Sequence, residues 1–346
     1  MEIDVDGVAQ KGELKAYAIS EHVEKGGTHS GDATLLLPAQ NISKEVEARI
    51  IEDSGKIAAA LNISGPFNTQ FLVKDDFVGV IETNLRASRS VPFVSKTYDV
   101  PFVRLATEIM ADVDTPVPFA SRCLDPVEHV AVKSPQFSFK RLLGADPILG
   151  VEMSSTGEVA CFGATKEEAF LKSVLAAGFR IPAAGGVVYF AMPEGADQKY
   201  IEVAKAFEAQ GFQIMPASVS TAEELAAGGV TMLETMDRAE WRASDNHAGA
   251  LEPVKAGGIE LVVDLTKHES LYDLRRASVD FSVPLITDVE QATLLAAALE
   301  DKPNLTITPH NEYFDQKEYY ANAKPKPRPK QTVSPLAHDA TALPGI

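Results

Sequence analysis

The chain opens on alternating polar and apolar residues, and this pattern predicts a β-strand from the second residue onward. In the run Glu2-Ile-Asp-Val-Asp-Gly the acids fall on one face, while Ile3 and Val5 fall on the other, as in a half-buried strand. Because no segment precedes this strand, we expect a truncated domain. Residues 43–61 place apolar side chains at helical spacing instead, which predicts an amphipathic helix with Ser43 as its N-cap.

Two apolar-rich runs, residues 69–73 and 77–83, flank the polar sequence Lys74-Asp-Asp76. Because such a polar triplet favours a turn, the two runs are predicted to form an antiparallel hairpin. Folding the chain about this turn brings Gln70 to within about one residue of Glu82 across the ladder.

Beyond residue 180 the pattern changes to buried strands that alternate with helices. A cluster of Pro, Ala and Gly at 182–186 marks a domain boundary, and the alternation predicts a parallel sheet covered by helices. From about residue 301 the periodicity fades, and the Pro-spaced basic sequence at 324–330 predicts an extended linker. The remaining predictions are helices at 99–111, 165–177, 199–210 and 221–227, strands at 187–192, 213–217 and 261–265, and a connection at 112–126.

Composition narrows the class of protein. With 346 residues, 45% of them hydrophobic and 23% charged, the chain has room for two domains with separate cores. A formal net charge of -17 repels polyanions and disfavours nucleic-acid binding. The two cysteines, Cys123 and Cys161, fit a reducing compartment. Since the chain shows neither a signal peptide nor a membrane-spanning apolar run, we expect a cytoplasmic protein that handles small ligands.

Gln70, Glu82 and Asn84 form the strongest candidate constellation. Glu82 and Asn84 lie two residues apart and therefore share a strand face, and the hairpin brings Gln70 opposite them. Two amide oxygens and a carboxylate are ligands that suit Mg²⁺. The alternative is that all three are solvated residues at a sheet edge, and the spacing alone favours this alternative.

Arg86, Arg89 and Lys96 follow this constellation and predict either a clamp for phosphate oxygens or a solvated cationic loop. The sequence Gly26-Gly-Thr-His-Ser-Gly-Asp32 predicts either a loop that contacts a nucleotide or a plain polar loop. It matches neither the Walker A motif nor the dinucleotide fingerprint. The sequence also has no Gly-x-Ser-x-Gly, His-Glu-x-x-His or Cys-x-x-Cys, which excludes nucleophilic, zinc and redox chemistry of those kinds.

Several longer sequence motifs identify a protein family more specifically than these residue spacings do. They are Ser20-Glu-His-Val-Glu24, Thr28-His-Ser-Gly-Asp32, Phe67-Asn-Thr-Gln-Phe71, and the runs 81–96, 132–140, 144–150 and 152–163. Together they resemble the large chain of eukaryotic-type carbamoyl-phosphate synthetase over roughly residues 2–300.

The resemblance implies an enzyme in which the distal ATP-grasp site phosphorylates carbamate to carbamoyl phosphate with ATP and Mg²⁺ or Mn²⁺. Thr83 and Leu85 replace the Val and Pro of the family's Glu-Val-Asn-Pro-Arg motif, whereas the ligand positions of that motif, Glu82 and Asn84, are unchanged. The roles that the resemblance implies are ATP contacts for Glu2, Gly27, Thr28, His29, Ser30, Gln70 and Glu82, metal ligation for Gln70, Glu82 and Asn84, and catalytic roles for Arg86 and Asn84, with Arg86 at the transferred phosphate.

Partners follow from the same resemblance. The family's adenine-binding strands and glycine-rich phosphate loop precede the position of Glu2, so we expect a C-terminal part that works with a missing N-terminal half and a glutaminase domain or subunit. The ending Ala342-Leu-Pro-Gly-Ile346 resembles the start of a dihydroorotase domain, which favours pyrimidine over arginine biosynthesis. The alternative is a non-catalytic fragment or metabolite-binding module. Another ATP-grasp ligase, such as a biotin-dependent carboxylase, would share the Glu-x-Asn pair but not the run 81–96.

The second region resembles the methylglyoxal-synthase-like regulatory domain of that family. The predicted fold class is therefore α/β, with an α+β ATP-grasp remnant at 1–181, a Rossmann-like parallel α/β domain at 182–300 and a linker at 301–346. An Asp at position 264, where phosphate-binding members have Asn, would repel a phosphate. A domain kept for packing and assembly is the alternative. The candidate contacts for a small-molecule effector are Lys199, Ser218, Thr221, Asp264 and Thr266.

Overall fold

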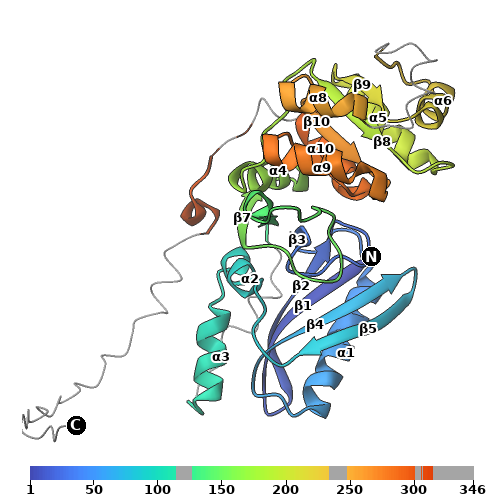
Figure 1. The fold of residues 1–346 in the computed structure, drawn as a ribbon. Coiled ribbons are helices and arrows are strands. Elements are labelled where there is room, and N and C mark those ends of the chain that lie inside the picture. The colour runs from blue at the N-terminus through green and yellow to red at the C-terminus, as the bar shows by residue number, and fades with distance from the viewer. Residues whose placement is uncertain (114–126, 234–247, 301–304, 306, 315–346) are drawn as a thin grey trace, which may run out of the picture. The chain divides into compact units, whose positions relative to one another are not determined.

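The computed structural model describes residues 1–113, 127–233, 248–300, 305 and 307–314 (Figure 1). Met1–Thr306 form one compact unit and Ile307–Ile346 a second. In the second unit the described residues include a short 3-10 helix, His310–Tyr313. Among the described residues, no helix is both long and apolar enough to cross a membrane.

The first part of the chain builds a seven-stranded antiparallel sheet in the order β5-β4-β1-β2-β3-β6-β7. The strand predicted at the start of the chain is β1, Glu2–Gln10, which lies between β2 and β4. The other strands are β2 Glu13–His22, β3 Leu35–Leu37, β4 Gly65–Lys74, β5 Phe77–Asn84, β6 Val130–Gln136 and β7 Gly157–Gly163.

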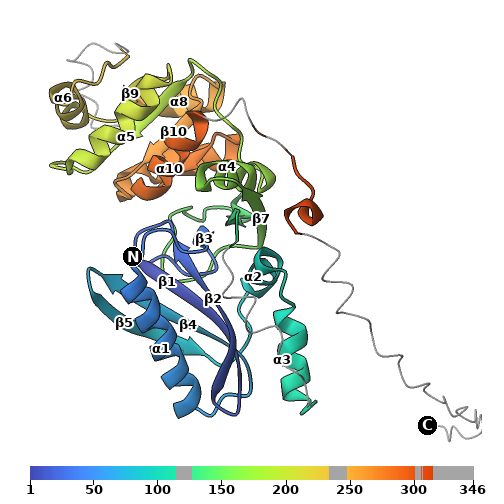
Figure 2. The same ribbon diagram turned by 180° about the vertical axis from the view of Figure 1, so that it is seen from behind.

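Helix α1, Lys44–Ala60, packs on the apolar face of this sheet, as Figure 2 shows. Ile3 and Val5 of β1 are buried together with Val46 and Ile50 of α1. The hydroxyl of Ser43 accepts a hydrogen bond from the amide of Val46 at 3.2 Å, which caps the first turn. The predicted helix and its N-cap are therefore confirmed.

The acidic face of β1 is buried as well, so the expectation of a half-buried strand was wrong. Glu2, Asp4 and Asp6 are only 7%, 2% and 1% exposed. Loop residues distant in the sequence cover this face and supply hydrogen bonds: Gly27 donates to Glu2, and Ser90 donates to Asp6. A strand pattern shows which side chains share a face, but it does not show what lies over that face.

The predicted hairpin is confirmed as β4 and β5. Gln70 stands opposite Glu82 and Asn68 opposite Asn84, with a register shift next to Gln70. The turn contains Asp75 with a φ of 52°, the left-handed region that Asp tolerates better than most residues. In the sheet order, β5 is the outermost strand on its side.

The helix predicted at 99–111 is confirmed, although it is shorter than expected and a helix that was not predicted precedes it. Helix α2 spans Val91–Tyr98 and helix α3 spans Phe102–Met110. Asp99 has a φ of 53° and ends α2. Pro101 disfavours helical geometry at the residue before it, so α3 begins only after this proline. The predicted connection at 112–126 lies almost wholly outside the described residues.

The second half of the first unit contains the predicted parallel sheet, with four strands in the order β11-β10-β8-β9. Side chains on one face pack with helices α5 and α10, and those on the other face pack with α8 and α9, as expected for a parallel sheet. The pattern did not predict α8, α9, α10 or β11. The elements are β8 Val187–Ala191, α5 Gln198–Ala209, β9 Gln213–Pro216, α6 Val219–Ala227, α8 Ala248–Ala256, β10 Leu261–Asp264, α9 Tyr272–Phe281, β11 Leu285–Ile286 and α10 Val289–Glu300.

The two sheets share one hydrophobic core. Helix α4, Lys166–Ala176, confirms the helix predicted at 165–177. Its Phe170 is fully buried in a cluster with Phe190 of β8 and Leu295 of α10. The boundary predicted at 182 stays a prediction, because this cluster includes residues from both sides of it. Most of the linker predicted at 301–346 lies outside the described residues.

Side chains of helix α9 form hydrogen bonds with the segment that links β6 to β7. Arg275 donates hydrogen bonds to both carboxylate oxygens of Asp146 at 2.8 and 2.6 Å. Arg276 donates to the carbonyl oxygens of Phe139 and Ala145, and Tyr272 donates to the carbonyl of Gly144. These contacts tie the second half of the unit to a segment whose later residues reach the candidate site.

Candidate functional site

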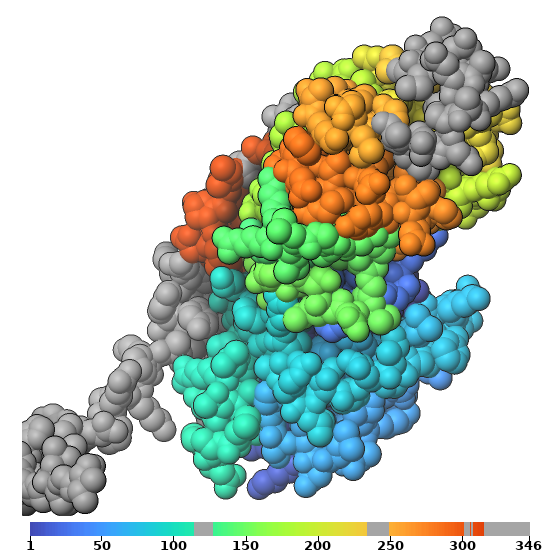
Figure 3. Space-filling model, viewed as in Figure 1, coloured from blue at the N-terminus to red at the C-terminus, as the bar shows by residue number. Residues whose placement is uncertain are grey.

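A polar cavity of about 310 Å³ lies over the acidic face of β1. The strand register places two rows of polar residues across three strands: Asp4 stands opposite Gln70, and Gln70 opposite Glu82. In the next row the order is Asp6, Asn68 and Asn84. In Figure 3 the surface is hollowed between the cyan hairpin and the green segment around residue 150, with blue N-terminal residues behind.

Most of the candidate residues meet at this cavity, although they come from separate segments. The loop at 26–32, the hairpin and the turn after β5 all contribute to its walls. Glu2, Gly27 and Thr28 do not line it but lie in or beside the same loop, where the Gly27 amide donates to a carboxylate oxygen of Glu2 at 2.8 Å. The predicted residues that line the cavity are His29, Ser30, Gln70, Glu82, Asn84 and Arg86.

Of the three predicted metal ligands, Gln70 and Asn84 donate hydrogen bonds through their NH₂ groups, and Glu82 accepts one of these bonds. The Gln70 amide donates to the hydroxyl of Ser30 at 2.8 Å, and the Asn84 amide donates to Glu82 Oε1 at 2.8 Å. Amide and carboxylate oxygens are suited to Mg²⁺. Glu82 is exposed whereas Gln70 and Asn84 are half-buried. The described residues contain no group of three or more His, Cys, Asp or Glu side chains that could hold a metal, so a cation here depends on the two amides.

Two arginines line the same cavity from the turn after β5. Arg86 is exposed, and its Nη2 lies 3.4 Å from Asn84 Oδ1. Arg89 donates to the hydroxyl of Ser155 at 3.0 Å, which fixes it against the segment before β7. Lys96, the third cation of the sequence pattern, lies on α2 and is not among the residues that line the cavity.

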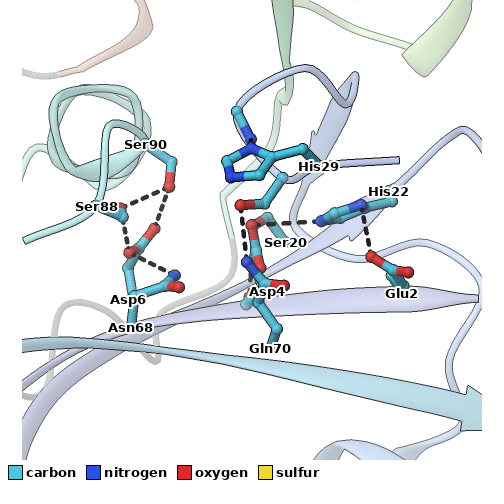
Figure 4. Close-up of polar contacts among 12 residues, drawn as sticks. Glu2, Asp4, Asp6, Ser20, His22, His29, Asn68, Gln70, Ser88 and Ser90 are labelled. Carbon is cyan, nitrogen blue, oxygen red and sulfur yellow. Dashed lines mark hydrogen bonds and ion pairs between the residues drawn. The ribbon is translucent and has the colours of Figure 1, made fainter. Parts of the chain in front are cut away.

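Asp6, which sequence analysis did not select, anchors the turn that carries these arginines. Its carboxylate accepts hydrogen bonds from Asn68 at 3.1 Å, Ser88 at 2.5 Å and Ser90 at 2.6 Å (Figure 4). Burial, together with the neighbouring charge of Asp4, raises the pKa of Asp6 to about 6, although the three hydrogen bonds lower it. The alternation of β1 could have identified Asp6 as a neighbour of Glu2 on the same face.

His22 lies between two carboxylates beside the cavity. Its Nδ1 is 3.5 Å from Glu2 Oε2 and its Nε2 is 3.3 Å from Asp4 Oδ2 (Figure 4). Burial alone would lower the pKa of this imidazole, but the negative charges of Asp4, Glu2 and Glu24 outweigh burial and raise it. Sequence analysis did not select this histidine, because its two acidic neighbours become visible only when β1 and β2 pair.

Lys133 was missed as part of this site, whereas Asp32 belongs to the loop at 26–32 that was predicted either to contact a nucleotide or to be a plain polar loop. Lys133 of β6 lines the cavity, is 1% exposed, and donates to the carbonyl of Ser30 at 3.1 Å. Burial lowers the pKa of its ammonium group. Asp32 accepts hydrogen bonds from the amides of Ser154 and Ser155 at 2.7 and 2.8 Å, and so it fastens the 150–155 segment to the loop at 26–32.

The predicted effector contacts lie at or just beyond the carboxyl ends of the parallel strands, or on the helix that follows β8. Ser218 caps α6 and accepts a hydrogen bond from the Thr221 amide at 3.1 Å. Lys199 is paired with Glu290. Asp264 is fully buried and accepts hydrogen bonds from Thr266 Oγ1 at 2.6 Å and from Arg275 at 2.8 Å. Arg275 therefore neutralises the charge that was expected to repel a phosphate.

Comparisons with known proteins point to one family. The model described as "Carbamoyl-phosphate synthase L chain, ATP binding domain" matches residues 17–115. The chain is 40% identical over 320 residues to the multifunctional protein URA2 of Saccharomyces cerevisiae, a match that covers 89% of this chain and 14% of that protein. It is also 40% identical over 307 residues to the mitochondrial carbamoyl-phosphate synthase [ammonia] of Homo sapiens, covering 86% of this chain and 20% of that protein.

The chain thus spans no more than a fifth of the length of these two relatives. Among solved structures, an N5-carboxyaminoimidazole synthase from Aspergillus clavatus in complex with ADP matches with a TM-score of 0.38 and 14% identity, over 51% of this chain and 52% of that chain. A likeness at this level is too low to support an inference about function.

Proposed function

This chain is homologous to the large chain of carbamoyl-phosphate synthase, an ATP-grasp ligase, over most of its own length, and we propose that residues 1–181 form the distal part of a site that phosphorylates carbamate. In the proposed reaction a carbamate oxygen attacks the γ-phosphorus of ATP. The bond from that phosphorus to the bridging oxygen breaks, and ADP leaves with the electron pair. The observation that carries the proposal is the placement of Gln70, Glu82 and Asn84 beside Arg86 over one cavity.

The donor set of the hairpin fits a hard divalent cation. Gln70, Glu82 and Asn84 would hold Mg²⁺ or Mn²⁺ through one carboxylate and two amide oxygens. The cation, when bound, neutralises phosphate charge during transfer. The hydrogen bonds of the Gln70 and Asn84 NH₂ groups orient both amides, and the Asn84 oxygen also lies 3.4 Å from Arg86 Nη2.

Arg86 and Arg89 are proposed to hold the transferred phosphoryl group. Each guanidinium offers a planar set of N–H donors to phosphate oxygens. Arg89 is positioned by Ser155 and Arg86 by Asn84, and the whole turn is anchored on Asp6 through Ser88 and Ser90. Such preorganisation would place positive charge where negative charge develops during the proposed transfer.

The nucleotide itself is proposed to lie along the loop at 26–32. Gly27 has a φ of 103°, and a Cβ added there would meet no atom within 4 Å, so the backbone is open to a ligand on that side. Glu2 receives the Gly27 amide and would contact the ribose. Thr28, His29 and Ser30 follow in the loop, and the last two line the cavity.

The region 182–300 is proposed to be a methylglyoxal-synthase-like regulatory domain. Its support is the parallel sheet with Ser218, Thr221 and Thr266 placed at or just beyond the carboxyl ends of its strands, where open α/β sheets bind ligands. Because Asp264 is internally neutralised by Arg275, a phosphate-bearing effector would not meet a free carboxylate there. Retention for packing is the competing proposal, favoured by the core that the two sheets share.

The wider setting is also proposed rather than observed. Relatives of this chain are much longer, so further parts such as the preceding half of the ATP site are expected to act with it. A glutaminase partner, a dihydroorotase domain and a role in pyrimidine rather than arginine synthesis remain expectations from the resemblance. A cytoplasmic location also stays a prediction, since one similar protein is described as mitochondrial.

Calorimetric titration of the purified full chain with ATP in excess Mg²⁺ tests the proposal. Wild type should bind, and Glu82→Gln should lower the affinity by at least about tenfold because the only carboxylate of the set is lost. Glu223→Gln, an exposed change on α6, is the matched control and should behave as wild type. Equal binding by all three proteins would show that the ligand assignment is wrong. No binding by any of them would favour the non-catalytic module.

A further inference from the structure

One buried carboxylate oxygen at the cavity has no hydrogen-bond partner. Asp4 is 2% exposed and lines the cavity. Its Oδ2 is 3.3 Å from His22 Nε2, whereas its Oδ1 has no partner within the described part of the chain. A buried acceptor that is left unpaired costs free energy, so this atom needs an explanation that the other contacts of the site do not give.

The neighbouring buried carboxylates are all engaged by the protein. Asp6 accepts three hydrogen bonds from side chains. Asp32 accepts two backbone amides, and Glu24 accepts the amide and the hydroxyl of Thr34, each at 2.7 Å. Asp4 therefore differs from them in having an oxygen that the fold leaves for something else.

The cations around the cavity do not supply the missing partner. The ammonium of Lys133 donates to the carbonyl of Ser30. Arg89 donates to Ser155, and Arg86 donates to the carbonyl of Ala87. His22 engages the other oxygen, Oδ2, and this contact holds the carboxylate beside the cavity.

The register relates Asp4 to the candidate cation ligands. Asp4, Gln70 and Glu82 form one row across β1, β4 and β5, and all three line the cavity. Two strand spacings separate Asp4 from Glu82, which is about 9–10 Å between the backbones. A short Asp side chain at that separation does not reach an ion held by Glu82 directly, but it does reach a water molecule bound to that ion.

We propose that Asp4 is an outer-shell residue of the cation site, whose Oδ1 accepts a hydrogen bond from a water molecule bound to the divalent cation held by Gln70 and Glu82. The inference rests on the proposed function and adds a residue to it. The carboxylate orients the bound water and adds negative charge near the ion, and outer-shell residues of this kind typically change metal affinity by about 10–100-fold. His22 acts as the positioning residue for Asp4.

Mn²⁺ alone serves as the probe, with free ion measured by electron paramagnetic resonance during titration of the full chain. Asp4→Asn should weaken binding by about 10–100-fold, and Glu82→Gln should weaken it at least as much. Glu21→Gln is the matched control, because Glu21 is 4% exposed and lies next to His22 but accepts its hydrogen bonds from Gln40 and Asn41. If Asp4→Asn does not give the native circular dichroism spectrum, Asp4→Ser replaces it with the same expectation.

The outcomes separate the two proposals. If Asp4→Asn binds Mn²⁺ as wild type does while Glu82→Gln is weakened, the outer-shell role is wrong and the cation site stands. If wild type binds no Mn²⁺, or Glu82→Gln binds as tightly as wild type, the cation site itself is wrong and the role of Asp4 falls with it. Weakening in Glu21→Gln equal to that in Asp4→Asn would mean that only the overall charge matters, which also overturns the inference.

Discussion

Replacement of Arg275 by Met should destabilise the protein strongly, because it leaves a buried charge without its partner. The Arg275 side chain is 0% exposed and donates to Asp264 at 2.8 Å, and Asp264 is also 0% exposed. The same guanidinium holds both oxygens of Asp146 and the carbonyl of His268. Met fills a similar volume without any donor.

The expected cost is about 3–5 kcal/mol, the usual range when one member of a buried ion pair is removed. Asp264 dominates this cost, since it is fully buried and keeps only the hydrogen bonds from Thr266. Asp146 contributes little, because its side chain is 35% exposed and becomes hydrated instead. Adding Asp264→Asn to Arg275→Met should therefore recover part of the loss, as the stranded charge disappears.

Guanidinium chloride unfolding followed by circular dichroism measures both variants. Arg180→Met is the matched control, since Arg180 makes a surface ion pair with Glu260 and is 55% exposed. This control should change the free energy of unfolding by less than about 1 kcal/mol. A similarly small loss for Arg275→Met, or no recovery in the double variant, would refute the argument that Asp264 depends on Arg275.

Three further predictions follow from the first sheet. Burial and the charge of Asp4 raise the pKa of Asp6 from its ordinary 3.8 to about 6, so the folded state binds a proton there that the unfolded state releases. Stability should fall by up to about 3 kcal/mol as pH rises from 4 to 6, and urea unfolding should show this loss in wild type but less of it in Asp6→Asn. Ser90→Ala removes a 2.6 Å hydrogen bond to Asp6 and should cost about 1–3 kcal/mol in the same assay; an unchanged midpoint would contradict the anchoring role of Asp6. Ile50→Ala, at 0% exposure in the core under α1, should lower the unfolding free energy by about 2–5 kcal/mol, and a loss below 1 kcal/mol would mean that this core is not closely packed.

Local chemistry in the sequence was enough for several elements. Ser43 caps its helix because its hydroxyl meets an amide only three residues away, and the hairpin forms about a two-residue turn, Asp75 and Asp76, that fixes its register. The parallel sheet followed from alternating strands and helices. The helix cap, the hairpin and the alternation of strands and helices each depend on residues that are close in the chain, so the sequence pattern was enough to predict them.

The role of the acidic face of β1 was decided by tertiary structure. Alternation showed that Glu2, Asp4 and Asp6 share a face, but the serines that anchor Asp6 lie more than 80 residues away in sequence. Whether a carboxylate is solvated, paired or left for a ligand depends on these distant partners, and the strand pattern is the same in all three cases.

The same division explains the second half of the unit. The sequence places Asp264 at the end of a predicted strand, and its negative charge was expected to repel a phosphate. Only the folded chain shows that Arg275, on a helix absent from the predicted elements, neutralises it and reaches Asp146, 129 residues distant in sequence. Sequence by itself determined which side chains share a face; the approach of remote charges, which sets the electrostatics of each site, required the three-dimensional fold because Coulomb energy depends on distance in space and on burial.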